Sequence, residues 1–305
     1  MSVRLQPLVR ARVARLGARG ADWAERLPGR LEDLCEQWGL ELGRPLAGGS
    51  ASYVVAARTR DGAPRVLKVL VPDPDLADEA PVLAAADGTG YARLYEVEPD
   101  ALLMEALGQP LERSGASPED AFGALVTTLR RAWQVPAGLV VGRRPVDKAA
   151  LLAADLERHV ALVAPAVADE VRRTVDAAGE VARALSAAYD PAAGVLAHGD
   201  AHPGNLLRRP GGGWAFVDPD GLVVEPAYDL GVVLRDHSRR LLEHPSAADL
   251  HRGWVALVAD QAGADPARVA AWAFVERVST GLFVCALGSP AVGLPFLRSA
   301  ALLVP

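Results

Sequence analysis

The segment from Leu196 to Asp218, which reads LAHGDAHPGNLLRRPGGGWAFVD, constrains the fold of this 305-residue chain more than any other. It contains the pattern H-x-D-x-x-x-x-N, followed by a short break and an apolar run, Trp214 to Val217, that ends on Asp218. We expect one loop to carry Asp200 and Asn205, and a strand to return Asp218 to the same place.

These residue types suit phosphoryl transfer, which requires a carboxylate near the attacking hydroxyl and oxygen ligands that hold Mg²⁺ between the phosphates. Asp200 is the predicted catalytic carboxylate, and Asn205 and Asp218 are the predicted metal ligands. His198 is grouped with the catalytic residues, and we expect it to order the loop through hydrogen bonds. A zinc site formed by His198, Asp200 and His202 is the alternative, but it leaves the pairing of Asn205 with Asp218 unexplained.

The run HGDAHPGN followed by VDPDGLVVEPAYDLG resembles the catalytic and metal loops of the aminoglycoside phosphotransferases, in particular the streptomycin 6-phosphotransferase and hydroxyurea kinase branch. The resemblance implies an α+β, protein-kinase-like bilobal fold. Residues 1–107 would form an N-terminal nucleotide-binding lobe with an antiparallel sheet, including a helical extension over 1–39. Residues 108–305 would form a larger, mainly helical C-terminal lobe with the catalytic loop, the metal loop and the acceptor pocket.

Before the predicted sheet, apolar residues recur at three- and four-residue steps from Trp23 to Trp38 and predict a helical stripe. Pro28 interrupts this stripe, so we expect two short helices with Pro28 near the first turn of the second.

From Leu40 onward the pattern predicts strands separated by a Gly48-Gly49 turn and an Asp61-Gly62 hairpin. A glycine pair lets the backbone close over phosphates, so Gly48, Gly49 and the hydroxyls of Ser50 and Ser52 are predicted to bind the nucleotide.

Lys68 lies between apolar residues on the third predicted strand, where a buried lysine requires an anionic partner. The functional interpretation is a contact to the α and β phosphates, and the alternative is a lysine on the wet face of the strand. The resemblance implies that Glu79 on the following helix holds Lys68, with Asp78 as a rival. That helix must begin near Asp78, because Pro81 is tolerated only in a first turn.

A hairpin over 91–105 leads into LLMEALGQPL, which resembles the hinge between kinase lobes. The resemblance implies that backbone groups near Glu105 and Leu107 bind the adenine edge and that Met104 borders the adenine pocket.

Beyond the hinge, the sequence predicts helices over 118–136, 147–190, 247–262, 266–286 and 289–303. Asp229 is expected to open one more helix as its N-cap, and the resemblance implies that it braces the catalytic loop.

The net charge of −6 and the pI near 5.6 give no basic excess, so we expect no nucleic-acid partner. We also expect no membrane association, because no stretch approaches the ~18 apolar residues of a spanning helix. Cys35 and Cys285 are typical of reduced core residues in a cytoplasmic protein, with a disulfide between them as the alternative. A monomer is expected, with a dimer as the alternative.

Together these patterns predict an enzyme that moves the γ-phosphoryl of ATP, with GTP as the alternative, to a hydroxyl of a small molecule, using Mg²⁺. The resemblance implies an aminoglycoside acceptor such as streptomycin, and a cationic antibiotic would require carboxylates. Candidate carboxylates are Asp236, Glu243, Asp249, Asp260 and Glu276. The absence of acids from Ser279 to Pro305 keeps other acceptors open, including hydroxyurea, tuberactinomycin-type peptides and sugar-like metabolites. A catalytically silent kinase-like binding protein is the third interpretation.

Overall fold

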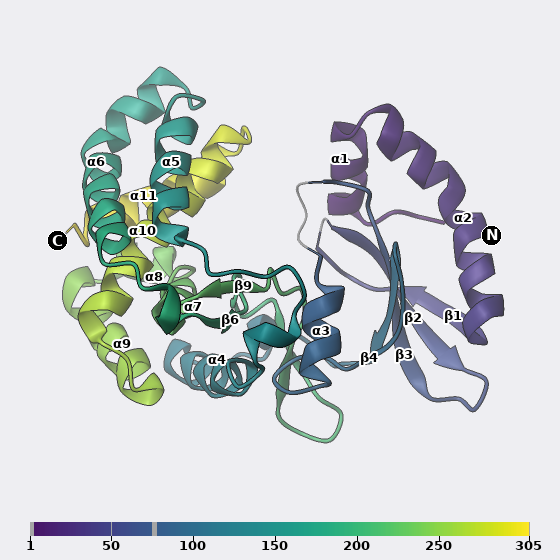
Figure 1. The fold of residues 1–305 in the computed structure, drawn as a ribbon. Coiled ribbons are helices and arrows are strands. Elements are labelled where there is room, and N and C mark those ends of the chain that lie inside the picture. The colour runs from purple at the N-terminus through teal and green to yellow at the C-terminus, as the bar shows by residue number, and fades with distance from the viewer. Residues whose placement is uncertain (1–2, 50, 75–77, 305) are drawn as a thin grey trace. The chain divides into compact units, whose positions relative to one another are not determined.

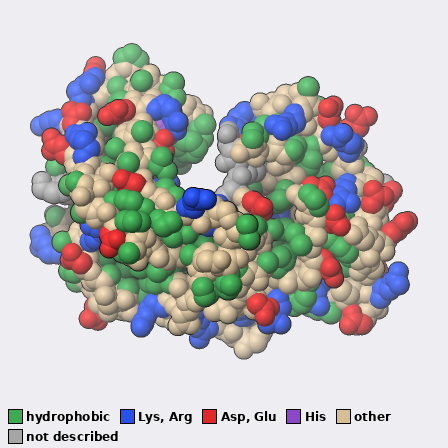
Figure 2. All heavy atoms as spheres, viewed as in Figure 1, with side chains coloured by type: hydrophobic (Ala, Val, Ile, Leu, Met, Phe, Trp, Pro, Cys, Tyr) green, Lys and Arg blue, Asp and Glu red, His purple; other side chains and the backbone are tan. Residues whose placement is uncertain are grey.

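The structure is a computed structural model, and it describes residues 3–49, 51–74 and 78–304. The chain divides into two compact units, of which the first contains residues 1–108 and 209–215 and the second contains 109–208 and 216–305. Acidic and basic side chains are interspersed on the face of each unit that Figure 2 shows.

The first unit is built on a five-stranded antiparallel sheet whose strands follow the order β1-β2-β3-β5-β4. The strands are β1 (Leu40–Pro45), β2 (Ser52–Thr59), β3 (Pro64–Leu70), β4 (Leu94–Glu98) and β5 (Ala101–Glu105). The Asp61-Gly62 hairpin joins β2 to β3 as predicted, and Gly62 has the positive φ of 82° that favours glycine in such a turn.

Two N-terminal helices, α1 (Pro7–Arg15) and α2 (Ala18–Trp38), cover one face of this sheet, while α3 (Ala80–Ala86) lies on its other side (Figure 1). The apolar stripe of α2 packs with alternate residues of β2 and β3 into one buried cluster. Its members on α2 are Trp23, Leu27, Leu31 and Leu34, and those on the two strands are Tyr53, Val55, Ala57, Leu67 and Val69.

The predicted break at Pro28 is wrong, because α2 runs through Pro28 without interruption. A proline inside a helix removes one backbone hydrogen bond and costs about 3 kcal/mol. Leu27 and Leu31 on either side of Pro28 are almost completely buried, and burying each leucine contributes about 1.5–3 kcal/mol. Burial of the stripe therefore offsets the local cost, and the helix continues.

The second unit is mainly helical, and its helices surround a small sheet of two antiparallel strands, β6 (Val195–Ala197) and β9 (Leu222–Val224) (Figure 1). Its helices are α4 (Pro118–Ala132), α5 (Lys148–Val160), α6 (Pro165–Ala187), α7 (Pro226–Val233), α8 (Ser238–Glu243), α9 (Ala247–Ala262), α10 (Pro266–Ala286) and α11 (Pro290–Ala301). The chain passes through β7 (Leu206–Arg208), enters the first unit at 209–215, and returns within β8 (Trp214–Phe216).

The central helix of the second unit, α10, contacts α5, α6, α7, α9 and α11. Among the described residues, α10 is the one helix that is long and apolar enough to cross a membrane by length and composition alone, so the prediction that no stretch is apolar enough is wrong. Two thirds of its apolar window (67%) is buried inside the protein, as in the core helix of a soluble protein. The apolar composition of α10 therefore follows from its central place in the helix packing.

Candidate active site

Lys68 lies on β3 opposite Val54 of β2 and Leu102 of β5. Side chains alternate along a strand, and Leu67 and Val69 point toward α2, so Lys68 lies on the other face of the sheet. There its ammonium group forms an ion pair with the carboxylate of Glu79, and both residues are at least 95% buried. Each charge would be costly to bury alone, so each stabilises the other.

The structure distinguishes Glu79 from its rival, Asp78. Asp78 is exposed, and its Oδ1 accepts a hydrogen bond of 3.1 Å from the amide of Ala80. The helix begins at Ala80, which places Pro81 in the first turn as predicted and leaves Glu79 directly before it. The predicted pairing of Lys68 with Glu79 is therefore present in the first unit.

The glycine-rich turn, residues 46–52, connects β1 to β2. Gly48 and Gly49 are exposed, and a Cβ added to Gly48 would lie only 3.1 Å from Cγ2 of Val54. Ser52 is buried. Its neighbour on β2, Tyr53, faces α2, so Ser52 points to the opposite face of the sheet, which is the face that carries Lys68. The fourth predicted phosphate-binding residue, Ser50, lies outside the described residues.

The predicted adenine-binding residues lie at the end of β5. Met104 is buried and lies opposite Val66 of β3. Val66 is two residues before Lys68, so Met104 and Lys68 share one face of the sheet. The amide of Glu105 already donates to the carbonyl of Arg93 at 2.8 Å, and its carboxylate forms an ion pair with Arg209. Leu107 follows in irregular backbone after the strand ends.

In the second unit, Asp229 fixes the start of the catalytic loop, residues 198–205. Its Oδ2 accepts hydrogen bonds from the amide of His198 and from Nε1 of Trp133, and its Oδ1 accepts one from the amide of Gly199, each 2.9 Å long. The predicted bracing role is therefore confirmed. The predicted N-cap role is wrong, because α7 begins at Pro226 and places Asp229 in its first turn.

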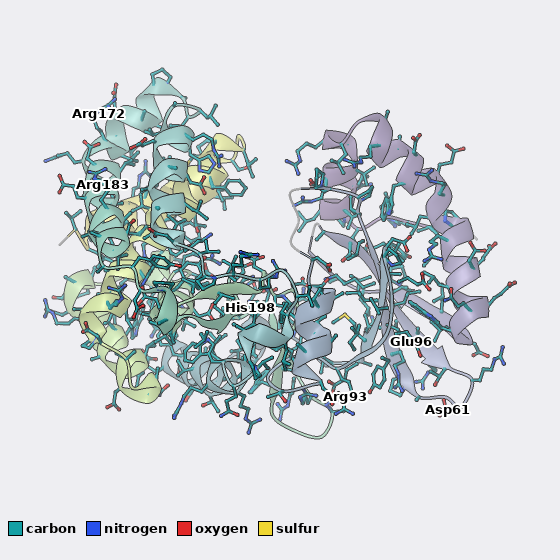
Figure 3. All side chains as sticks on the ribbon, in the orientation of Figure 1. Asp61, Arg93, Glu96, Arg172, Arg183 and His198 are labelled. Carbon is teal, nitrogen blue, oxygen red and sulfur yellow. The ribbon has the colours of Figure 1, made fainter. Side chains whose placement is uncertain are left out.

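His198 is completely buried beside this brace (Figure 3). Its Nδ1 accepts a hydrogen bond from the amide of Asp200 at 3.1 Å, which leaves the proton on Nε2 to be donated to the carbonyl of Val217 at 3.0 Å. Burial lowers the pKa of His198, in keeping with a neutral ring. Both ring nitrogens of His198 therefore form hydrogen bonds with backbone groups, of Asp200 and Val217. His198 orders the backbone and is not placed as a zinc ligand.

The side chain of Asp200 is 40% exposed, and its carboxylate contacts the guanidinium group of Arg235 and the imidazole ring of His202. Nη2 of Arg235 donates to its Oδ1 at 2.9 Å, and Nε2 of His202 lies 3.5 Å from its Oδ2. Burial opposes ionisation, but the hydrogen bond to His202 and the charge of Arg235 hold the pKa of Asp200 well below its usual range. Asp200 is therefore an ionised hydrogen-bond acceptor at neutral pH.

Asn205 and Asp218, the predicted metal ligands, are brought together by the backbone. The amide of Val217, next to Asp218, donates to the carbonyl of Asn205 at 3.0 Å. Nδ2 of Asn205 donates to the carbonyl of Asp200 at 3.0 Å, so its Oδ1 is the atom suited to a cation. Asp218 adopts a left-handed backbone conformation with φ of 57°, which is uncommon outside glycine and typical of functional sites.

These oxygens suit Mg²⁺, which prefers carboxylate and carbonyl ligands. The described residues contain no group of three or more histidine, cysteine or acidic side chains arranged for a metal. The zinc alternative therefore has no support in the part of the chain that the structure covers, whereas one carboxylate and one amide oxygen fit a magnesium ion shared with phosphates.

Arg235 is a residue that the sequence reasoning missed. Its side chain is only 12% exposed, and besides Asp200 it contacts Asp236 at 3.0 Å and Glu276 at 3.9 Å. Burial disfavours the charged form of Arg235, but these three carboxylates outweigh it and raise the pKa of Arg235 above its ordinary value. A single sequence gives no signal for this role, because Arg235 is 35 residues from Asp200 and follows an ordinary helix.

Of the five carboxylates considered for a cationic acceptor, two gather near Asp200. Asp236 and Glu276 both contact Arg235, and Glu276 is 96% buried with an Oε1 that makes no hydrogen bond within the described residues. The other three, Glu243, Asp249 and Asp260, are exposed on helices, and the first two form ion pairs with neighbouring arginines.

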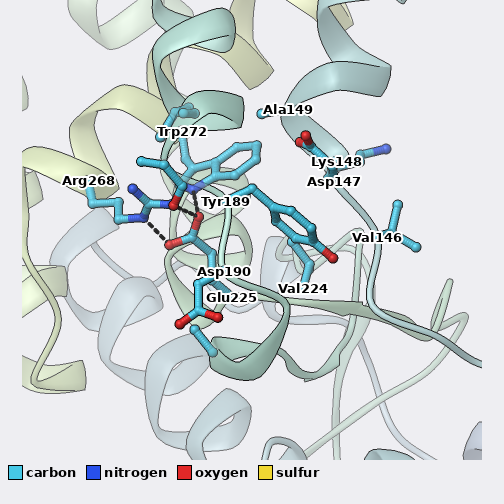
Figure 4. A pocket seen from close by; sticks show the side chains of 13 residues that line it. Val146, Asp147, Lys148, Ala149, Tyr189, Asp190, Val224, Glu225, Arg268 and Trp272 are labelled. Carbon is cyan, nitrogen blue, oxygen red and sulfur yellow. Dashed lines mark hydrogen bonds and ion pairs between the residues drawn. The ribbon is translucent and has the colours of Figure 1, made fainter.

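A separate cavity of about 300 Å³ lies in the second unit between α5, α6, β9 and α10 (Figure 4). One of its acids, Glu225, accepts hydrogen bonds from both Arg268 and Nε1 of Trp272. At its rim Asp147 caps α5 and accepts from Ser186, and Asp190 caps a short turn. These polar groups satisfy one another, which is typical of a structural hollow.

Comparison with known proteins supplies the family. The model for the aminoglycoside/hydroxyurea antibiotic resistance kinase family matches residues 37–286. The chain is 29% identical over 296 residues to a streptomycin 6-kinase of Streptomyces glaucescens, covering 94% of this chain and 92% of that protein. It is 32% identical over 231 residues to a hydroxyurea phosphotransferase of Kitasatospora aureofaciens, covering 70% of this chain and 62% of that protein.

Among solved structures, the fold is similar to that of a thermostable mutant of the aminoglycoside phosphotransferase APH(4)-Ia in a ternary complex with ADP and hygromycin B. The TM-score is 0.56 at 16% identity, over 88% of this chain and 98% of that chain. This likeness supports the predicted α+β, kinase-like fold class. On the match of the family model to most of its length, the chain belongs to the aminoglycoside/hydroxyurea antibiotic resistance kinase family.

Proposed function

We propose that this protein transfers the γ-phosphoryl group of ATP to a hydroxyl of a small molecule. The observation that carries the proposal is the catalytic loop, in which an ionised Asp200 lies beside Asn205 and is held by Arg235. Membership of a kinase family and the buried pair of Lys68 with Glu79 support it.

In this proposal Asp200 accepts a hydrogen bond from the acceptor hydroxyl and aligns its oxygen with the γ-phosphorus. Its lowered pKa makes it a weak base. A weak base suffices, because the transition state of phosphoryl transfer is largely dissociative and the proton leaves late. Arg235 keeps the carboxylate in one orientation, and His198 and Asp229 keep the loop backbone in place.

Asn205 and Asp218 would hold Mg²⁺, which when bound neutralises charge on the phosphate oxygens. Lys68, held by Glu79, would contact the α and β phosphates, and the glycine-rich turn would cover them. The adenine edge would lie near Met104, Glu105 and Leu107. Residues 1–107 would thus supply nucleotide binding, and residues 108–305 the catalytic loop, metal ligands and acceptor pocket.

For the acceptor we propose a cationic aminoglycoside such as streptomycin, made inactive as an antibiotic by phosphorylation. The carboxylates of Asp236 and Glu276 support this proposal, since they lie next to Arg235 and would attract basic groups. The relative from Kitasatospora aureofaciens, named as a hydroxyurea phosphotransferase, supports a small neutral acceptor as the alternative.

The test is an ADP-release assay with MgATP over a panel of aminoglycosides, tuberactinomycin peptides, hydroxyurea and amino sugars, with mass spectrometry of the product. The expected result is ADP release that depends on one class of acceptor and stops on chelation of Mg²⁺, with one phosphoryl group gained by that acceptor. Binding of MgATP without acceptor-dependent ADP release across the panel would instead favour a silent binding protein.

A further inference from the structure

The N-terminal helix α1 contacts the strands that frame the glycine-rich turn. The side-chain amide of Gln6, just before α1, donates hydrogen bonds to the carbonyl of Leu46 at 3.0 Å and to that of Val54 at 2.9 Å. The backbone amide of Leu46 also donates to Val54, at 2.9 Å. Leu46 begins the turn and Val54 lies on β2 two residues past its end, so Gln6, which is 91% buried, closes the base of the turn.

The same helix contacts the segment that connects Lys68 to Glu79. Arg12 and Arg15, one turn apart on α1, both form ion pairs with Oδ2 of Asp73, the second at 2.7 Å. The carboxylate of Asp73 is 99% buried. Asp73 lies five residues after Lys68 and six before Glu79, and its amide donates to Val71, whose own amide donates to Ala51 in the glycine-rich turn at 2.9 Å.

Helix α1 is itself fixed firmly to the first unit. A Cβ added to Gly20 of α2 would lie 2.1 Å from the carbonyl oxygen of Val13, so the two helices approach as closely as only glycine permits. Val9 of α1 is completely buried in the cluster that α2 forms with the sheet. The contacts of Gln6, Arg12 and Arg15 therefore originate from a rigid element.

We infer that α1 positions the phosphate-binding elements of the first unit, with Gln6, Arg12 and Arg15 as positioning residues for the nucleotide. The inference rests on the proposed function. Gln6 fixes Leu46 and Val54 on the two sides of the glycine-rich turn, and the two arginines fix Asp73, which follows Lys68 by five residues. A buried carboxylate with two arginine partners loses its compensation when they are removed, so the segment must shift or admit water.

The experiment uses three variants of the full chain: Gln6→Met, the double variant Arg12→Met with Arg15→Met, and Arg10→Met. Arg10 is exposed on the same helix and serves as the matched control. Steady-state kinetics give the KM for ATP, the KM for the acceptor and kcat. Hydrogen exchange of the nucleotide-free protein, measured on peptides that cover 46–54 and 68–74, reports the backbone directly.

The expected result is a rise in the KM for ATP on the order of tenfold in the Gln6 and double-arginine variants, as loss of positioning produces. The acceptor KM and kcat at saturating ATP should stay within about twofold of the unchanged protein. Exchange should increase in the two peptides, which lie in the first unit, and stay unchanged throughout the second unit. Arg12→Lys with Arg15→Lys should restore most of the ATP KM, and Arg10→Met should change nothing.

An unchanged KM for ATP would overturn the inference. So would a rise in both KM values with an equal fall in kcat, because that result indicates a structural role alone. The exchange measurement needs no turnover. If the unchanged protein releases no ADP with any acceptor, the proposed function fails, while exchange in 46–54 still decides whether α1 holds the turn. Gln6→Met removes no charge, so it tests the inference even if the double-arginine variant does not fold.

Discussion

At the scale of single residues, the site depends on charges that are buried in pairs. Lys68 with Glu79 and Arg235 with Asp200 each combine a cation that is almost fully covered with a carboxylate. Such pairs contribute little net stability. Removing one member of the buried Lys68–Glu79 pair leaves a charge that is costly to bury, whereas removing Arg235 takes a hydrogen-bond donor from the partly exposed carboxylate of Asp200. Their effect is therefore to hold a functional group in one place.

Replacing Lys68 with methionine should weaken nucleotide binding, because the contact to the phosphates is lost and Glu79 remains as a buried anion. We expect the KM for ATP to rise by on the order of tenfold or more, with a fall in kcat. The chain has one other lysine, Lys148, which lies 5.5 Å above the ring of Tyr228 in the second unit. Lys148→Met should leave the KM for ATP unchanged, and an equal effect of both substitutions would count against the role of Lys68.

His251 should make the protein sensitive to acid. Burial and the nearby charge of Arg277 lower its pKa to about 4 in the folded protein, below the ordinary value of 6.5. As the pH falls below 6.5 the unfolded chain binds a proton that the folded protein refuses, so stability is lost between about pH 6.5 and pH 4.

Urea unfolding at pH 7.5 and pH 5 measures this effect. His251→Gln should reduce the loss of unfolding free energy over that interval, by roughly 1–2 kcal/mol. His244 is exposed, and His244→Gln is the control that should leave the pH dependence as it is. If both variants lose stability in parallel with the unchanged protein, His251 is not the cause.

At the scale of elements, the regular segments follow the sequence closely where one signal dominates. The helices predicted over 247–262 and 266–286 match α9 and α10, because glycine or proline lies next to each end. The break at Pro28 was predicted wrongly, because the burial of Leu27 and Leu31 outweighs the local preference of proline. The start of α7 was misplaced because Asp229, a good N-cap residue, is used by the catalytic loop.

The contact of α7 with α10 depends on Gly231, since a Cβ there would lie 2.6 Å from Cβ of Trp272 and 2.8 Å from the amide of Ala273. Gly231→Ala should force the helices apart and lower the unfolding free energy by about 1–3 kcal/mol, because the neighbouring atoms are backbone atoms and a Cβ bonded directly to the backbone, none of which can move aside alone. Because α7 carries Asp229, activity should also fall.

Gly253 in α9 is the matched control, because nothing lies within 4 Å of a Cβ added there. Gly253→Ala should raise stability by about 0.5–1 kcal/mol, as alanine favours a helix interior. Chemical unfolding of both variants checks the contrast. A Gly231 variant as stable as the Gly253 variant would show that the two helices can separate without cost.

At the scale of the whole molecule, the sequence predicted the fold class and grouped Asp200 with Asn205, because these residues lie in one short loop. It also paired Lys68 with Glu79, where resemblance to a family supplied the link. It missed Arg235 and the contacts of Gln6 and Asp73 with distant segments, because such contacts join residues 35 to 61 positions apart. Pairings of this kind follow from tertiary packing, which has no local pattern.

The central claim is that Asp200 and its loop direct a phosphoryl group from ATP to a hydroxyl. The most direct measurement is mass spectrometry of the acceptor after incubation with MgATP and either the unchanged protein or Asp200→Asn. We expect one added phosphoryl group with the unchanged protein and a rate lower by on the order of 10²-fold or more with the variant. A variant that is folded and retains most of the turnover would contradict it.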